Sequence, residues 1–175
     1  MIILVNSLDN NSMYPVKHSL LAKLFHWGFV IIFIYGIYKQ VQDIEQLEDN
    51  SLLRFELIFA LIFIALLIIR FFYMKKTQQS SLPEDTPKIQ KVAARIVHNS
   101  MYISLFLVPM AGIFVGLFYA MGLKDGFLID VLVGLHEFSI QAIYWLIGIH
   151  ISAAIFHRIR KDGVWSFMVP FLKEK

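Results

Sequence analysis

The chain has 175 residues, of which 58% are hydrophobic and 17% are charged. Soluble domains are about 45–50% apolar and about 25% charged, so this composition indicates a chain that lies largely in lipid. There is no cysteine, which excludes disulfides, iron–sulfur clusters, thiolate-ligated haem and covalently attached haem. The formal net charge of +3 is small and dispersed, which argues against a nucleic-acid partner.

Four long apolar segments follow one another along the chain. Each is long enough to cross a hydrocarbon core of about 30 Å as a helix of about 20 residues. Their approximate bounds are 20–40, 52–73, 96–123 and 128–157. We therefore predict an all-α integral membrane protein, a four-helix transmembrane bundle whose helices satisfy their own backbone groups. In this prediction residues 16–175 form a single domain, residues 1–15 are an N-terminal extension, and Met13 is an alternative start.

The charged residues of the connections predict the orientation of the bundle. The first connection, 39–54, is rich in acidic residues, whereas the second, 70–95, and the C-terminal segment are rich in Lys and Arg. Basic connections stay on the cytoplasmic side of a membrane. The pattern therefore predicts that both termini are cytoplasmic.

Five of the six histidines fall within the predicted spans or at their ends. Ionisable side chains are costly inside a membrane, so this pattern suggests a function. In the fourth span His136, His150 and His157 are spaced by 14 and 7 residues, which returns to one helix face within about 40°. At 1.5 Å per residue, His136 and His150 are about 21 Å apart along the axis. This separation predicts two layers of sites, one near each membrane surface.

Depth in the membrane pairs His26 with His150. The first span runs outward and the fourth runs inward, so both histidines lie several residues inside the cytoplasmic ends of their helices. Two neutral imidazoles on facing helices are a standard way to hold a low-spin haem b iron. We therefore predict that His26 and His150 are the axial ligands of an inner haem. His98 and His157 lie closer to the surface and would line a second site beside it.

The outer layer has one histidine, His136, and the second span places Glu56 at its depth. Three interpretations stay open: Glu56 ligates iron opposite His136, Glu56 only hydrogen-bonds His136, or the outer haem is absent. Gly112 gives space at this depth, although Pro109 would kink the third helix. The sequence thus predicts one haem b and leaves a second open. Zinc or non-haem iron is disfavoured, because the ligands are not gathered at short helical spacings.

Several motifs resemble those of the bacterial cytochrome b561 family, which are small four-span haem b proteins of the inner membrane. The resemblance covers nearly the whole chain from Met13. It rests on the order of the motifs LFHWG, IIRFF, HNSMY, GLHEF and GIHISAAIFH, and on the 14- and 7-residue spacings of the last two. The resemblance implies a multi-pass protein of a bacterial inner membrane.

Residue roles follow from the same resemblance. It implies that His26 and His150 ligate one haem and that His136 is one ligand of the other. It implies that His98 and His157 are quinone-site or haem-environment residues. The chain departs from the family at one position, because Glu56 stands where the family has the histidine of the second span. This departure puts the outer haem in doubt.

The resemblance also implies that the chain is an oxidoreductase or electron carrier. Haem b would exchange electrons with the quinone pool, ubiquinone or menaquinone, and superoxide is a donor within the family. The alternative is a haem-binding anchor and relay subunit for a separate dehydrogenase or hydrogenase, which would dock as a peripheral redox partner. A transporter is disfavoured, because the chain has no inverted repeats or broken spans. Homodimer formation is left open.

Four basic residues at the predicted cytoplasmic rim have two interpretations. They would pair with haem propionates, or they would only keep the basic connections on the cytoplasmic side. They are Arg70, Arg95, Arg158 and Lys161.

Overall fold

The computed structural model describes residues 19–41, 43–77, 82–83 and 85–169. The predicted N-terminal extension and the alternative start at Met13 lie outside these residues.

Four long helices make up most of the described chain, and each is long and apolar enough to cross a membrane. They are α1 (Leu20–Lys39), α2 (Asn50–Thr77), α3 (Lys88–Ala120) and α4 (Phe127–Arg160). Two short helices accompany them: η1 (Ile44–Glu48) follows α1, and α5 (Val164–Met168) follows α4. No strand occurs within the described residues. The predicted all-helical protein with four membrane-capable helices is confirmed.

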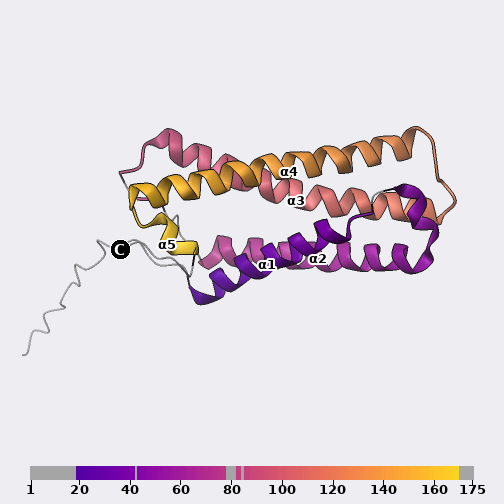
Figure 1. Cartoon of the computed structure of the whole chain (residues 1–175), viewed down its shortest axis with the longest axis horizontal. Helices are drawn as coiled ribbons and strands as arrows, with labels where there is room; N and C mark the ends of the chain where they lie inside the picture. The colour runs from indigo at the N-terminus through magenta and orange to yellow at the C-terminus, as the bar shows by residue number, and fades with distance from the viewer. Residues whose placement is uncertain (1–18, 42, 78–81, 84, 170–175) are drawn as a thin grey trace, which may run out of the picture.

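Two helical layers form the bundle, with α1 and α2 in one and α3 and α4 in the other (Figure 1). We call the end that holds Leu20 and Arg160 the inner end, and the end that holds Lys39 and Phe127 the outer end. These names follow the predicted orientation, which stays a prediction. The connection between α1 and α2, with η1 in it, and the connection between α3 and α4 both lie at the outer end (Figure 1).

The helices extend beyond the predicted spans at the inner end. Helix α3 begins at Lys88, eight residues before the predicted start at residue 96, and α2 continues to Thr77. The added turns carry Lys and Arg side chains, which do not lie in hydrocarbon. Apolarity marks only the part of a helix that crosses lipid, whereas backbone hydrogen bonding continues into the polar region. For this reason the apolar runs underestimate the length of these two helices.

Local signals fix the start of α1 and the end of α4. The hydroxyl oxygen of Ser19 accepts a hydrogen bond from the backbone N–H of Ala22 at 3.1 Å, which satisfies one of the unpaired donors of the first turn. Lys161 ends α4 in the left-handed conformation, at φ 54°. Gly163 then begins the short helix α5 at φ 86°, a backbone conformation that favours glycine.

The interior contains two groups of buried apolar side chains. The larger joins all four long helices and consists of Phe29, Phe63, Leu67, Leu105 and Ile143. The second lies toward the outer end, includes η1, and consists of Leu47, Leu53, Val115 and Tyr119. Helix α3 packs closely on α2 and α4, whereas α1 packs mainly on α2. Helix α1 is therefore the least closely packed of the four long helices.

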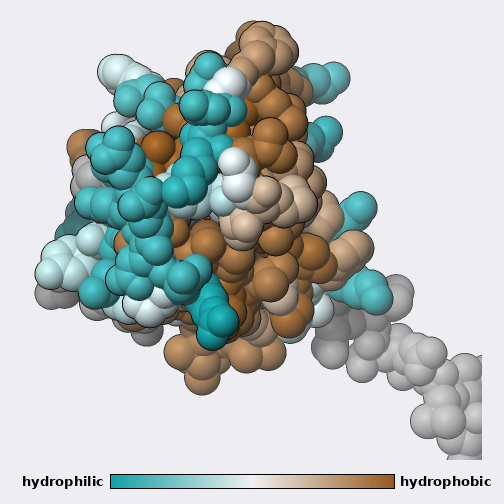
Figure 2. Space-filling view, turned by 90° about the vertical axis from the view of Figure 1, so that its right-hand side faces the viewer, coloured by the Kyte–Doolittle hydropathy of each residue, from teal (hydrophilic) through white to brown (hydrophobic). Residues whose placement is uncertain are grey.

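The outward faces of the helices are strongly apolar. Large hydrophobic side chains such as Ile31, Phe138 and Trp145 are more than 60% exposed. Figure 2 views the molecule from its outer end, and shows hydrophilic residues gathered on that end and hydrophobic residues along the flank. Such an apolar flank is expected where lipid chains surround the protein.

One exposed ion pair joins the two connections at the outer end. The ammonium of Lys124 lies 2.9 Å from a carboxylate oxygen of Glu48. Its hydrogen bond and charge lower the pKa of the Glu48 carboxyl, and the carboxylate in turn raises the pKa of Lys124. Because both side chains are exposed, the pair contributes little to stability.

Candidate functional site

The first candidate ligand pair lies in the space between α1 and α4, toward the inner end. The ring centroids of His26 on α1 and His150 on α4 are 6.4 Å apart, with the ring planes at 57°. A metal held between two imidazoles at about 2 Å from each nitrogen separates the ring centres by about 6 Å. The two rings therefore stand at a separation that suits one shared metal ion.

A third histidine, His98 of α3, lies beside His150. Their ring centroids are 5.0 Å apart and their planes are nearly perpendicular, at 82°. The Nδ1–H of His98 donates to the carbonyl oxygen of Ala94, one turn earlier, at 2.6 Å. This separation is shorter than two imidazoles on one metal require, so His26 is the better partner for His150. His98 thus belongs to the surroundings of the pair.

Arg70 of α2 joins the same cluster from a position next to His26. Its guanidinium donates to Nδ1 of His26 at 3.3 Å and to the hydroxyl of Tyr102 at 2.8 Å. The guanidinium carbon also lies 5.6 Å from the ring centre of Phe29. Its Nε atom is buried and has no hydrogen-bond partner among the described residues. A cation held inside a span, without a carboxylate among these contacts, has capacity for an anionic ligand.

The hydrogen bond from Arg70 determines the tautomer of His26. Arg70 can only donate, so Nδ1 of His26 accepts and the proton of the neutral ring is on Nε2. An imidazole that binds a metal through Nε2 instead carries its proton on Nδ1. Binding of a metal through Nε2 therefore requires this hydrogen bond to break, which frees the guanidinium for another acceptor.

His157 lies about 10 Å further along α4 than His150, at 1.5 Å per residue. Its Nδ1–H donates to a carboxylate oxygen of Asp162 at 2.6 Å. The other oxygen of Asp162 accepts from the backbone N–H of Val164 at 3.4 Å. Asp162 thus links His157 to the start of α5 and fixes the orientation of the ring.

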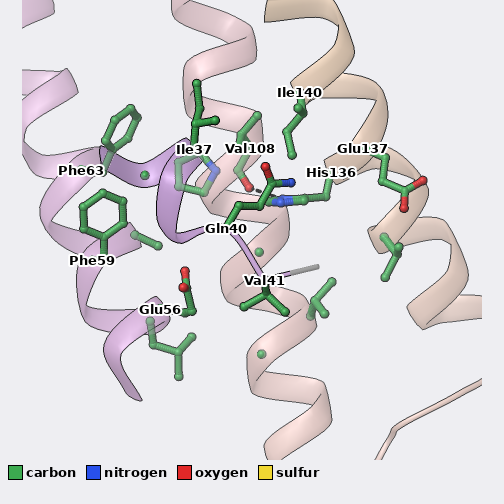
Figure 3. Close-up of a pocket in the computed structure, with 18 of the residues that line it drawn as sticks. Ile37, Gln40, Val41, Glu56, Phe59, Phe63, Val108, His136, Glu137 and Ile140 are labelled. Carbon is green, nitrogen blue, oxygen red and sulfur yellow. Dashed lines mark hydrogen bonds between the residues drawn. The ribbon is translucent and has the colours of Figure 1, made fainter. Parts of the chain in front are cut away.

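Toward the outer end a cavity of about 320 Å³ lies between the helices. His136 lines it from α4, and its Nδ1–H donates to the backbone carbonyl oxygen of Val108 at 2.7 Å. The proton on Nδ1 leaves the lone pair of Nε2 as an acceptor. Figure 3 shows the His136 ring reaching toward the middle of the cavity, while the neighbouring Glu137 points away.

Glu56 lines the same cavity from α2 (Figure 3). Its Oε1 atom is buried and has no hydrogen-bond partner among the described residues. Within those residues no hydrogen bond joins Glu56 to His136. The structure therefore does not contain the hydrogen bond of the second interpretation. The structure brings the two side chains to one cavity and leaves the carboxyl oxygen unpaired.

Glycines near the sites differ in what surrounds them. A Cβ atom added at Gly112 would lie 3.4 Å from Cε1 of His136, so the predicted space at Gly112 is taken by the His136 ring. At Gly134 and Gly148 a Cβ atom would meet no other atom within 4 Å. Helix α3 also contains Pro109, which is buried in its interior.

We expect Gly112→Leu to destabilise the fold, because the leucine side chain would overlap the His136 ring. Overpacking of this kind typically costs about 1–3 kcal/mol. Thermal unfolding in detergent, followed by circular dichroism, would measure it. Gly134→Leu is the matched control, since it adds the same side chain to a helical glycine with open surroundings. Equal unfolding temperatures for the two variants would contradict the contact between Gly112 and His136.

The four rim cations take different positions. Arg70 contacts His26, as described above, whereas the guanidinium of Arg158 lies over the ring of Trp165 at 4.8 Å. Arg95 and Lys161 are exposed. Arg70 is therefore the best placed of the four to meet a ligand held by the histidine pair.

Sequence reasoning missed Tyr102, Asp162 and Gln40 as site residues. Tyr102 lies four residues after His98 on α3, so helical spacing would have placed it on the same side as that histidine. Asp162 lies beyond the end of α4, where helical spacing gives no guidance. Gln40 lines the outer cavity immediately after α1 ends, and its position depends on the path of the connection.

Among the described residues, no three His, Asp or Glu side chains gather closely enough to hold a metal ion on their own. A porphyrin supplies four nitrogen ligands to its iron, so a haem needs only the pair that His26 and His150 provide. The fold and this pair thus define a four-helix membrane protein of the haem-binding type.

Comparison with known proteins specifies the family. The family model for prokaryotic cytochrome b561 matches residues 17–171. The chain therefore belongs to the prokaryotic cytochrome b561 family, and the predicted resemblance is confirmed. Membership implies a multi-pass membrane protein that binds haem b and transfers electrons. A search of the curated proteins and a search of the solved structures each returned no match.

Proposed function

We propose that this protein transfers electrons between a haem b held by His26 and His150 and a quinone of the membrane. The observation that carries the proposal is the 6.4 Å separation of the two imidazole rings, contributed by the first and last membrane helices. When bound, haem b supplies a one-electron couple between ferrous and ferric iron. The side chains of this protein would hold the haem in place and set the charge and hydrogen bonds around it.

Arg70 supports this proposal through its charge and its unpaired nitrogen. Haem b carries two propionates, and the guanidinium of Arg70 contacts His26 of the pair directly, at 3.3 Å. Releasing Nδ1 of His26 would let Arg70 bind a propionate, while the proton of His26 moves to Nδ1. In this proposal Arg70 both anchors the cofactor and sets the charge near it.

The other inner histidines have supporting roles. His98 contacts the His150 ring and is assigned to the haem environment. The role of His157 as a quinone-site or haem-environment residue stays a prediction, and its hydrogen bond to Asp162 makes it a proton-accepting group of fixed orientation. The proposal also includes three predictions made from the sequence. Both termini lie in the cytoplasm, the protein resides in a bacterial inner membrane, and superoxide is a candidate electron donor.

The alternative function, an anchor and relay subunit for a separate dehydrogenase or hydrogenase, has no specific observation in its favour. Its peripheral partner stays a prediction, as does homodimer formation. The isolated chain distinguishes the two functions, because a redox protein that acts by itself needs no docked subunit to react with quinone.

Purified protein in detergent provides the test. We expect a reduced-minus-oxidised spectrum of a six-coordinate haem b, and rapid reoxidation of the reduced haem by ubiquinone-1 or menadione. His26→Ala serves as the control, since reoxidation should vanish with the haem. A purified chain that carries haem but reacts with neither quinone would contradict the proposal.

A further inference from the structure

The outer cavity differs in its chemistry from the inner histidine pair. Among the described residues that line it there is neither Lys nor Arg. Its carboxyl groups are those of Asp43 and Glu56, whereas the carboxylate of Glu137, on the same wall, points away from the cavity (Figure 3). A haem carries two propionates, which need cations or water at their end of the site. Without a cation in the described lining, a neutral ligand is favoured over a dianionic one.

The donor set of the cavity also does not fit a second haem of the inner kind. One imidazole, from His136, reaches the cavity, and the polar side chain that α2 contributes to the lining is the carboxyl group of Glu56 (Figure 3). No third His, Asp or Glu gathers with these two to form a metal site within the described chain. The residues present thus do not match a bis-imidazole haem.

Shape and polarity point to a ligand with one ring. The cavity volume, about 320 Å³, is near the lower limit of small-molecule sites, which span about 300–1,000 Å³. Most of its walls are apolar, with Phe33, Phe59 and Phe63 among the lining residues. Its polar groups are a few side chains that face an otherwise apolar space. A flat, neutral ring with oxygen atoms at its edge satisfies both features.

Two groups in the cavity have unused hydrogen-bonding capacity. Oε1 of Glu56 is buried without a partner. His136 uses its Nδ1–H on the Val108 carbonyl, which leaves Nε2 as an acceptor. A protonated Glu56 donates to a quinone carbonyl, and Nε2 of His136 accepts from a quinol hydroxyl. Such a ligand would pair Oε1 of Glu56, which is otherwise buried without a partner, and would use the acceptor nitrogen of His136.

We propose that the outer cavity binds the ring of a quinone or quinol, with Glu56 and His136 as its hydrogen-bonding partners, in place of a second haem. The inference rests on the proposed function, in which a membrane quinone is the redox partner, and it locates that partner at the outer end. It concerns binding, and it gives a role to the buried, unpaired oxygen of Glu56.

Binding of ubiquinone-1 to the purified full-length chain, measured by isothermal titration calorimetry, tests the proposal. Glu56→Leu keeps a similar volume and removes the hydrogen-bonding group, so we expect about tenfold weaker binding. Glu56→Gln replaces the carboxyl group with an amide, which can still donate a hydrogen bond, and should give an intermediate loss. Glu137→Leu is the matched control, because this exposed carboxylate points away from the cavity and its loss should change the affinity less than about twofold.

Haem content separates this inference from the proposed function. We expect one haem per chain in the wild type and in both Glu56 variants, with the spectrum lost in His26→Ala. Two haems per chain, one of them lost in both Glu56→Leu and His136→Ala, would overturn the inference and leave the inner haem in place. Unchanged ubiquinone-1 affinity in Glu56→Leu would overturn it as well. A chain that lacks haem but binds ubiquinone-1 through Glu56 would refute the proposed function alone.

Discussion

His150→Ala is expected to remove the haem b spectrum of the purified protein, and His26→Ala is expected to do the same. Each substitution deletes one of the two imidazoles whose rings are 6.4 Å apart. With one axial ligand gone, the iron loses half of its protein coordination, and we expect haem content to fall to about a tenth of the wild-type value. The pyridine haemochrome assay on protein purified from haem-sufficient cells measures this content.

His98→Ala is the matched control for these two variants. The ring of His98 lies closer to His150 than that of His26 does, at 5.0 Å, yet its distance does not suit a shared iron. We expect this variant to keep its haem with a small spectral shift. Added imidazole should restore haem binding to His150→Gly, because it fills the vacated ligand position. Full haem content in both His26→Ala and His150→Ala would show that the ligand pair has been assigned wrongly.

Arg70→Leu is expected to lower the midpoint potential of the haem. The guanidinium is a permanent positive charge, and a positive neighbour disfavours the oxidised iron, which carries one more positive charge. For a charge on the order of 10 Å from the iron and an effective dielectric constant of about 20, the interaction is about 1.7 kcal/mol. This energy corresponds to about 70 mV for a one-electron couple. A spectroelectrochemical titration measures the shift.

Two further variants separate charge from hydrogen bonding at this position. Arg70→Lys keeps the positive charge, so its potential should stay closer to that of the wild type. Tyr102→Phe removes only the hydroxyl that accepts from Arg70 at 2.8 Å, and it should change the potential least. An unchanged or raised potential in Arg70→Leu would refute the placement of this cation next to the haem.

The number and order of the membrane helices could be predicted from the sequence because lipid imposes a simple requirement. An apolar run must be long enough to cross the hydrocarbon core, and four such runs are present. The helix ends were less predictable. Helix α3 begins in a charged segment at Lys88, and the short helices η1 and α5 depend on local turn geometry and packing.

The inner histidine pair was predictable for a related reason. Depth along a straight helix follows from residue count, so His26 and His150 could be matched without knowledge of the packing. The contact between Arg70 and His26 was not predictable in this way, since it depends on how α2 is rotated against α1. The ligand at the outer end was likewise left open, because the charge and volume of a cavity appear only when five elements are brought together around it.

The weak attachment of α1 has a consequence for biosynthesis. This helix packs mainly on α2, so a chain newly inserted into the membrane has little to hold its first helix against its last. A group that bonds to both His26 and His150 would tie these helices together and stabilise the native state according to its concentration and affinity. The cellular supply of the cofactor would then govern how much of the protein matures and escapes degradation.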